Sequence, residues 1–176
     1  MEVTKTKKLF VALFFIGCII WIGGSIIRTA IVYDIYEPYE KSLKFRYWVD
    51  EKIALMTVRH FSIGALYTAF GFLLTFISFL NLFSWIKTRF KTDGWLLMSV
   101  ILYILSVISE LILLYFDLRL GLYVFFQSNI SYFSNEIQTF FFRRFVNYNF
   151  LMVYNWLAIF TIIFFLLFKP LKKNER

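Results

Sequence analysis

The chain has 176 residues and is strongly apolar: 60% of its residues are hydrophobic, 23% are aromatic, and the mean hydropathy is +0.70. Soluble domains contain roughly 45–50% apolar residues, so this composition is typical of a membrane protein. The net charge of +8 does not indicate nucleic-acid binding, because the basic residues stand mostly in short clusters between apolar runs. We therefore expect one transmembrane domain, residues 1–176, and no nucleic-acid partner.

Four apolar segments are long enough to cross a membrane as helices. In chain order they cover about residues 9–33, 53–83, 95–120 and 150–168. The first follows a short lysine cluster but is too long for the apolar part of a signal peptide, so we expect it to be retained. Both prolines lie outside the segments, which favours unbroken helices. The predicted fold class is an all-α integral membrane protein built as an antiparallel four-helix transmembrane bundle.

The basic clusters predict the orientation of these spans. The N-terminus, the connection 85–94 and the C-terminus together carry ten Lys or Arg and three acidic residues, whereas the other side carries nine and eight. Compact basic clusters mark cytoplasmic segments, so we expect both termini to be cytoplasmic. The outer connections are then residues 34–52 and 121–149. The second is rich in aromatic residues and is either an interfacial helix ending at Arg143–Arg144 or a loop at head-group level.

Polar and small residues recur at helical spacing along each segment, which predicts one polar face per helix. These faces carry Gly17, Trp21, Gly24 and Arg28 in the first segment; His60, Gly64, Tyr67, Gly71 and Ser78 in the second; Ser99, Tyr103, Ser106, Glu110 and Asp117 in the third; and Tyr148 and Asn155 in the fourth. Small residues allow close helix packing, and polar residues turn away from lipid. We therefore expect a polar seam inside the bundle.

Arg28 stands inside an apolar run, where an unpaired charge costs about 2.5–3.5 kcal/mol at the bilayer centre. Counting about 1.5 Å per residue from the helix ends places Arg28 and Glu110 at nearly the same depth. We therefore predict that these two residues pair, directly or through water, with Tyr67 or Asn155 completing the hydrogen bonds. The candidate ligand-binding residues are those that the four segments bring to the outward half: Arg28, Arg59, His60, Tyr67, Glu110, Asp117 and Asn155.

An intramembrane ion pair indicates a functional site by default, and the alternative is a structural role in which the pair only fixes helix register. The sequence contains no GxSxG, HExxH or cysteine pair, which disfavours an enzyme. Acid–base chemistry by Glu110 or Asp117 on an outer-leaflet lipid remains open, with Arg28 or Arg59 holding a phosphate. The single histidine and single cysteine do not make a haem or zinc site, so we expect no metal and no cofactor.

Two interpretations of function follow. The first is an accessory or structural subunit of a larger membrane complex, which binds partner helices and lipid. The alternative is a binding protein or enzyme for an outer-leaflet lipid or quinone-like ligand, centred on Arg28 and Glu110. In either case we expect an integral protein of a bacterial inner (plasma) membrane or of an organelle membrane.

Overall fold

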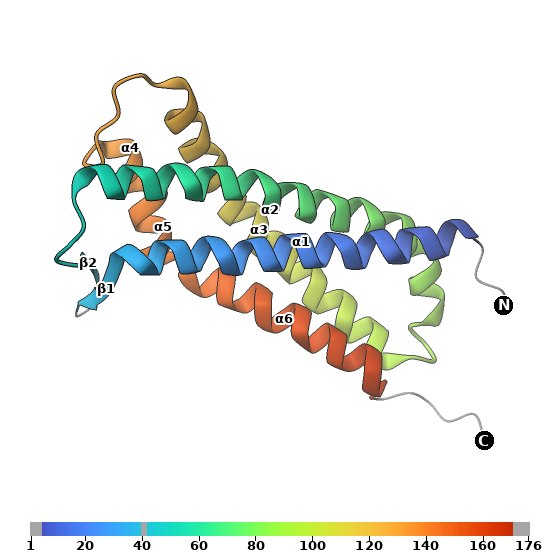
Figure 1. Ribbon diagram of the computed structural model, residues 1–176. Helices are drawn as coiled ribbons and strands as arrows, with labels where there is room; N and C mark the ends of the chain where they lie inside the picture. Colours follow the sequence, from blue (N-terminus) through green and yellow to red (C-terminus); the bar gives the residue numbers. More distant parts are fainter. Residues whose placement is uncertain (1–4, 40–41, 171–176) are drawn as a thin grey trace.

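In the computed structural model, which describes residues 5–39 and 42–170, four long helices cover most of the described chain (Figure 1). They are α1 (Lys5–Ile35), α2 (Glu51–Ile86, continued by the 3₁₀ turn η1 at Lys87–Arg89), α3 (Gly94–Phe126) and α6 (Asn149–Phe168). Each is long and apolar enough to cross a membrane. They overlap the four predicted segments, which confirms the prediction of a helical bundle with four helices long and apolar enough to be spans.

The helices differ in length relative to a bilayer. At about 1.5 Å per residue, the 20 residues of α6 extend roughly 30 Å, which matches a hydrocarbon core of about 30 Å. The 31, 36 and 33 residues of α1, α2 and α3 extend roughly 46–54 Å. These three helices therefore either tilt or continue beyond the hydrocarbon core.

A small folded region closes one end of the molecule (Figure 1). Strand β1 (Tyr36–Tyr39) follows α1 directly and pairs antiparallel with β2 (Ser42–Phe45), so that Tyr36 lies opposite Phe45. This hairpin lies within the predicted connection 34–52, where the sequence indicated no strand. At the same end, α4 (Asn135–Ile137), the π-helical turn η2 (Gln138–Phe142) and α5 (Arg143–Asn147) form a helical segment within the predicted connection 121–149. Part of that connection, residues 135–147, is therefore helical and continues past Arg144, where the predicted interfacial helix ended.

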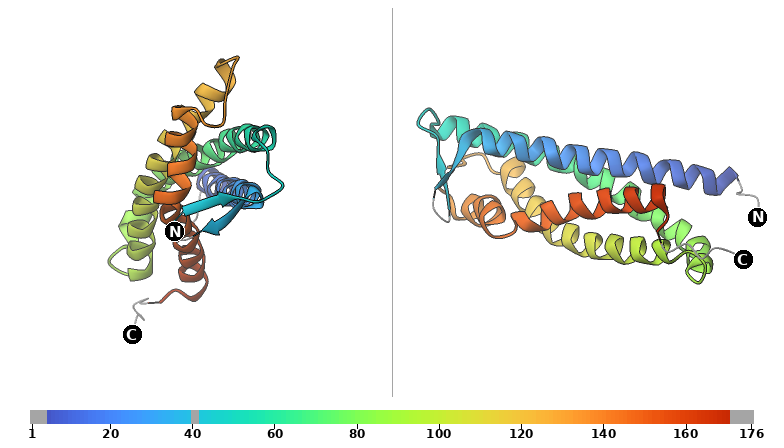
Figure 2. Two further views of the ribbon diagram at one scale, coloured as in Figure 1. Left: turned by 90° about the vertical axis from the view of Figure 1, so that its left-hand side faces the viewer. Right: turned by 90° about the horizontal axis from the view of Figure 1, so that it is seen from below.

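Close backbone contact joins α1 to α2. A Cβ atom added at Gly71 would lie 2.6 Å from the backbone nitrogen of Trp21, and one added at Gly17 would lie 2.7 Å from the backbone nitrogen of Thr75. These glycines therefore set how closely the two helices approach, as the small-residue spacing predicted. Figure 2 shows the resulting arrangement, with α1 beside α2 and α3 beside α6.

Two apolar clusters fill the interior and leave a polar layer between them. The hairpin cluster lies at the β1–β2 end and consists of Val32, Ile35, Tyr36, Ala54, Val58, Phe61, Leu120, Tyr132, Ile137, Phe141 and Phe145. The terminal cluster lies toward the other end and consists of Cys18, Trp21, Ile22, Phe72, Phe79, Val100, Tyr103 and Ile159. Along α1 and α3, Arg28 and Glu110 occupy positions between the two clusters. The candidate site is this intermediate layer.

Candidate functional site

The centre of the polar layer is a carboxylate shared by two arginines. Arg28 of α1 donates from Nη1 to Oδ2 of Asp117 on α3 at 2.8 Å. Arg144 of α5 donates from Nη2 to the same oxygen at 3.3 Å, and its Nε lies 2.8 Å from Oδ1. All three residues are at most 4% exposed. Since water is excluded, each charge depends on its protein partners.

Aromatic side chains enclose the arginines on the hairpin side. The guanidinium carbons of Arg28 and Arg144 lie 4.7 and 5.0 Å from the ring centre of Phe61, which is fully buried on α2. Arg144 lies equally close to the ring of Phe145. Cations at this range are attracted to an aromatic face. A Cβ atom at Gly64 would lie 2.7 Å from Cγ of Arg28, so the absence of a side chain there leaves room for the arginine.

Glu110 belongs to the same layer but does not pair with Arg28. It accepts a 2.9 Å hydrogen bond from the side-chain nitrogen of Asn155 on α6, and both residues are at most 4% exposed. Glu110 stands seven residues before Asp117, about 10 Å along α3. The predicted Arg28–Glu110 pair is therefore wrong in its acidic partner, because the relative offset of α1 and α3 places Arg28 beside Asp117. The expected contact of Asn155 with the polar layer is present.

The predicted polar face of α2 is only partly turned inward: Gly64, Gly71 and Ser78 face the bundle, whereas His60 and Tyr67 do not. Tyr67 is 67% exposed, and Arg59 and His60 are also exposed, so none of these three candidate residues lies in the buried layer. The buried face of α2 instead includes Thr68, whose hydroxyl donates to the carbonyl oxygens of Gly64 and Ala65. When a threonine hydroxyl donates to a carbonyl oxygen of its own helix, the side chain can be buried without a hydrogen-bond partner on a neighbouring helix. Burial of small and threonine residues has therefore decided the orientation of α2.

Arg144 is the site residue that the sequence analysis missed. It was considered only as the end of an interfacial helix. In the structure, residues 135–147 fold back against the bundle, and Ile137, Phe141, Arg144 and Phe145 are buried together while Arg143 is exposed. The i, i+4, i+7, i+8 spacing of these four residues is the signal that could have indicated a buried face containing Arg144.

Some buried polar atoms of the layer make no hydrogen bond within the described part of the chain. Nε of Arg28, Nη1 of Arg144 and Oδ1 of Asn155 are buried and have no hydrogen-bond partner among the residues that the structure describes. Burial lowers the pKa of Arg144, although the carboxylate of Asp117 opposes this effect. The layer therefore holds opposite charges together among buried side chains and has donors on Arg28 and Arg144 and an acceptor on Asn155 that are unpartnered within the described ranges.

A cavity of about 180 Å³ between α2 and α3 reaches Asp117 and is otherwise lined mainly by apolar residues, including Ala65, Leu114 and Phe125.

Across the described ranges 5–39 and 42–170, no group of three or more His, Cys, Asp or Glu side chains could hold a metal ion. Comparisons of the chain with protein-family models, with curated proteins and with solved structures found no match.

Proposed function

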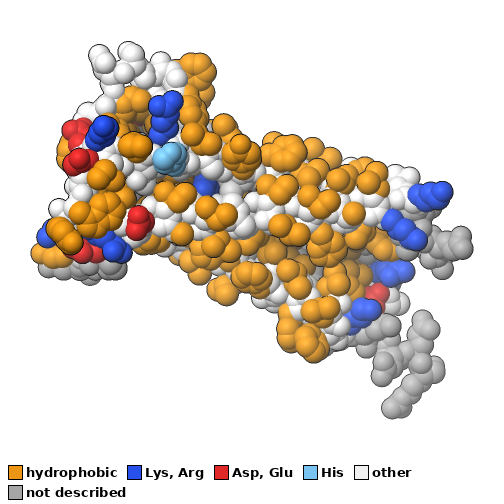
Figure 3. All heavy atoms as spheres, viewed as in Figure 1, with side chains coloured by type: hydrophobic (Ala, Val, Ile, Leu, Met, Phe, Trp, Pro, Cys, Tyr) orange, Lys and Arg blue, Asp and Glu red, His pale blue; other side chains and the backbone are white. Residues whose placement is uncertain are grey.

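We propose that the protein is an accessory subunit of a larger membrane complex and acts by binding a partner transmembrane helix and lipid. In this proposal the four spans form an antiparallel bundle with both termini cytoplasmic, in a bacterial inner (plasma) membrane or an organelle membrane. The three basic clusters support the orientation, because their described members lie at the end of the molecule opposite the β1–β2 hairpin (Figures 1 and 3).

The observation that carries the proposal is the outward polar face of α2, formed by Arg59, His60 and Tyr67. Figure 3 shows the histidine on the surface of this face, beside basic and apolar side chains. Tyr67 stands 16 residues after the start of α2, about 24 Å along a helix of roughly 54 Å. Tyrosine is enriched at membrane interfaces, not at mid-depth facing lipid. A neighbouring helix that accepts hydrogen bonds from this face would shield these polar side chains from lipid.

The buried Arg28–Asp117–Arg144 arrangement supports a structural role for the interior. It joins α1, α3 and α5 by charged contacts and holds the hairpin end of the bundle together. A rigid bundle presents the outward face of α2 in one geometry, so that a partner loses little conformational freedom on binding.

Site-specific photo-crosslinking in native membranes tests this proposal. A photoreactive residue at Tyr67 should give one protein adduct of defined mass, whereas the same residue at Leu111, a position on α3 that is also exposed, should give only lipid adducts. His60→Ala and Tyr67→Ala should also reduce stoichiometric co-purification of the partner in mild detergent. A monodisperse isolated chain without a protein adduct at position 67 would contradict the proposal.

A second candidate function is binding of an outer-leaflet lipid or quinone-like ligand, which could include catalysis. It is supported by the cavity between α2 and α3 that reaches Asp117, and by the spare donors of Arg28 and Arg144. Leu114→Trp should fill this cavity and release a co-extracted ligand detected by native mass spectrometry. If Leu114→Trp leaves the spectrum of bound molecules unchanged, the cavity does not hold the ligand.

A further inference from the structure

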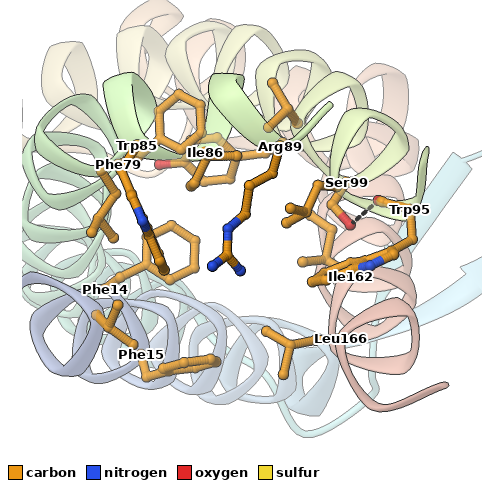
Figure 4. Close-up of a pocket in the computed structure, with 15 residues that line it drawn as sticks. Phe14, Phe15, Phe79, Trp85, Ile86, Arg89, Trp95, Ser99, Ile162 and Leu166 are labelled. Carbon is orange, nitrogen blue, oxygen red and sulfur yellow. Dashed lines mark hydrogen bonds between the residues drawn. The ribbon is translucent and has the colours of Figure 1, made fainter. Parts of the chain in front are cut away.

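A mainly apolar chamber lies at the end of the bundle opposite the β1–β2 hairpin. This chamber has a volume of about 260 Å³ and is bounded by all four long helices (Figure 4). Its wall is mainly apolar and aromatic, and the residues that matter for binding are Trp85, Arg89, Trp95, Tyr103 and Leu166. The volume lies just below the roughly 300–1,000 Å³ of small-molecule sites, which suits a single chain-like group.

The chamber contains a cation. Figure 4 shows the side chain of Arg89 extending from the end of α2 with its guanidinium in the middle of the space. Its guanidinium carbon lies 5.0 Å from the ring centre of Trp85, and Nζ of Lys7 lies 5.7 Å from the same ring. Within the described part of the chain, Arg89 has no acidic partner within ion-pair distance. The indole of Trp85 therefore has two cations near it, of which Arg89 lines the chamber.

The wall also has unused hydrogen-bond donors. The hydroxyl of Tyr103, a residue only 2% exposed, and the indole N–H of Trp95 are buried and have no partner among the described residues. Buried donors are normally paired, so these two indicate a missing acceptor. The wall is otherwise apolar except for Ser99, whose hydroxyl donates to the backbone oxygen of Trp95.

We infer that this chamber binds an anionic phospholipid. The phosphate is held by Arg89, with Lys7 adding positive charge beside Trp85; an ester oxygen accepts from Trp95 or Tyr103, and one acyl chain occupies the apolar space. Arginine presents several donors to a phosphate, and tryptophan is typical of the depth at which head groups meet acyl chains. The basic cluster at this end attracts anionic lipids to the opening. This site is separate from the Asp117 layer and from the outward face of α2.

The test uses the full chain in vesicles with equal amounts of phosphatidylglycerol and phosphatidylcholine of identical acyl chains. After mild detergent extraction, native mass spectrometry gives the ratio of the two bound lipids. The native chain should retain phosphatidylglycerol preferentially, and Arg89→Gln should lower that preference about fivefold. Lys91→Gln is the matched control, because Lys91 is an exposed cation of the same connection that does not line the chamber. Glycerol phosphate, which lacks acyl chains, should not displace the lipid.

Two further variants separate loss of the site from loss of the fold. Arg89→Lys retains the charge and should keep most of the preference, and Leu166→Trp, which fills the chamber from α6, should reduce retention of both lipids. Size-exclusion elution and helical circular dichroism check that each variant is folded. If the native chain binds the two lipids in the vesicle ratio, or if Arg89→Gln and Lys91→Gln behave alike, the inference is wrong.

Discussion

Substitution of Asp117 by asparagine tests the central interaction of the bundle. Asparagine has nearly the same shape, so the change removes the charge without opening a cavity. Two buried arginines lose their shared counter-ion, and two charged hydrogen bonds of 2.8 and 3.3 Å are weakened. At about 1.5–3 kcal/mol for each such bond, the loss is roughly 3–6 kcal/mol. This agrees with about 3–5 kcal/mol for removing one partner of a buried ion pair.

The assay is reversible unfolding in mixed micelles at increasing denaturing detergent, followed by circular dichroism. Asp117→Asn should lower the free energy of unfolding by about 3–5 kcal/mol, which is roughly a 100- to 5,000-fold change in the unfolding equilibrium constant. Arg143→Gln, an exposed cation next to Arg144, is the matched control and should change stability by less than about 0.5 kcal/mol. Glu110→Gln should cost only about 1 kcal/mol, because glutamine can still accept from Asn155.

A double-mutant cycle tests whether the effect is the pairing itself. Arg144→Gln should cost less in the Asp117→Asn background than in the native chain, because the guanidinium has already lost its partner. If Asp117→Asn costs less than about 1 kcal/mol and the two substitutions are additive, the reasoning that these charges stabilise one another is refuted.

Two other predictions concern helix packing and the hairpin end. Gly71→Leu should separate α1 from α2 and cost several kcal/mol in the same unfolding assay, because a Cβ atom there would lie 2.6 Å from the backbone of Trp21; Gly23→Leu, where a Cβ atom meets nothing within 4 Å, should be nearly neutral. Burial and the neighbouring Tyr132 hydroxyl raise the pKa of Tyr36 above its ordinary value of 10. The folded state then retains a proton that the unfolded state releases above about pH 10, so the free energy of unfolding should fall by about 1.4 kcal/mol per pH unit there, and Tyr36→Phe should make this fall shallower. An identical slope in native and Tyr36→Phe chains would contradict this assignment.

The sequence predicted the polar faces of α1 and α3 well. Trp21 and Arg28 on α1, and Glu110 and Asp117 on α3, are buried where their helical spacing placed them. On these helices the polar residues stand out from long runs of Leu, Ile and Phe, so the inward face is the one that lipid disfavours.

On α2 the same argument held for Gly64, Gly71 and Ser78 but failed for the larger polar residues. His60 and Tyr67 are the conspicuous polar residues of that segment, yet both are exposed. Thr68 and Thr75 are buried in their place, because each hydroxyl donates to a carbonyl oxygen of its own helix, and because glycines let α1 approach closely. Because any helical threonine can donate to a carbonyl oxygen of its own helix, the sequence does not predict which threonines are buried.

The acidic partner of Arg28 could also be identified only from the three-dimensional arrangement of the helices. Glu110 and Asp117 are two helical turns apart on one face of α3, and an offset of about 10 Å between α1 and α3 decides which of them the arginine contacts. Counting residues from the helix ends does not resolve this choice, since α1 and α3 are longer than a bilayer core is thick.

The sequence by itself determined that the chain has four helices long and apolar enough to cross a membrane, because this property depends on the length and composition of each segment alone. It also determined which side of α1 and α3 faces inward. Only the tertiary structure decided that Asp117 is shared by Arg28 and Arg144, that α2 turns a polar face outward, and that residues 135–147 fold back onto the bundle. These features depend on offsets and rotations between helices, which side-chain packing at the contacts sets and which no single segment encodes.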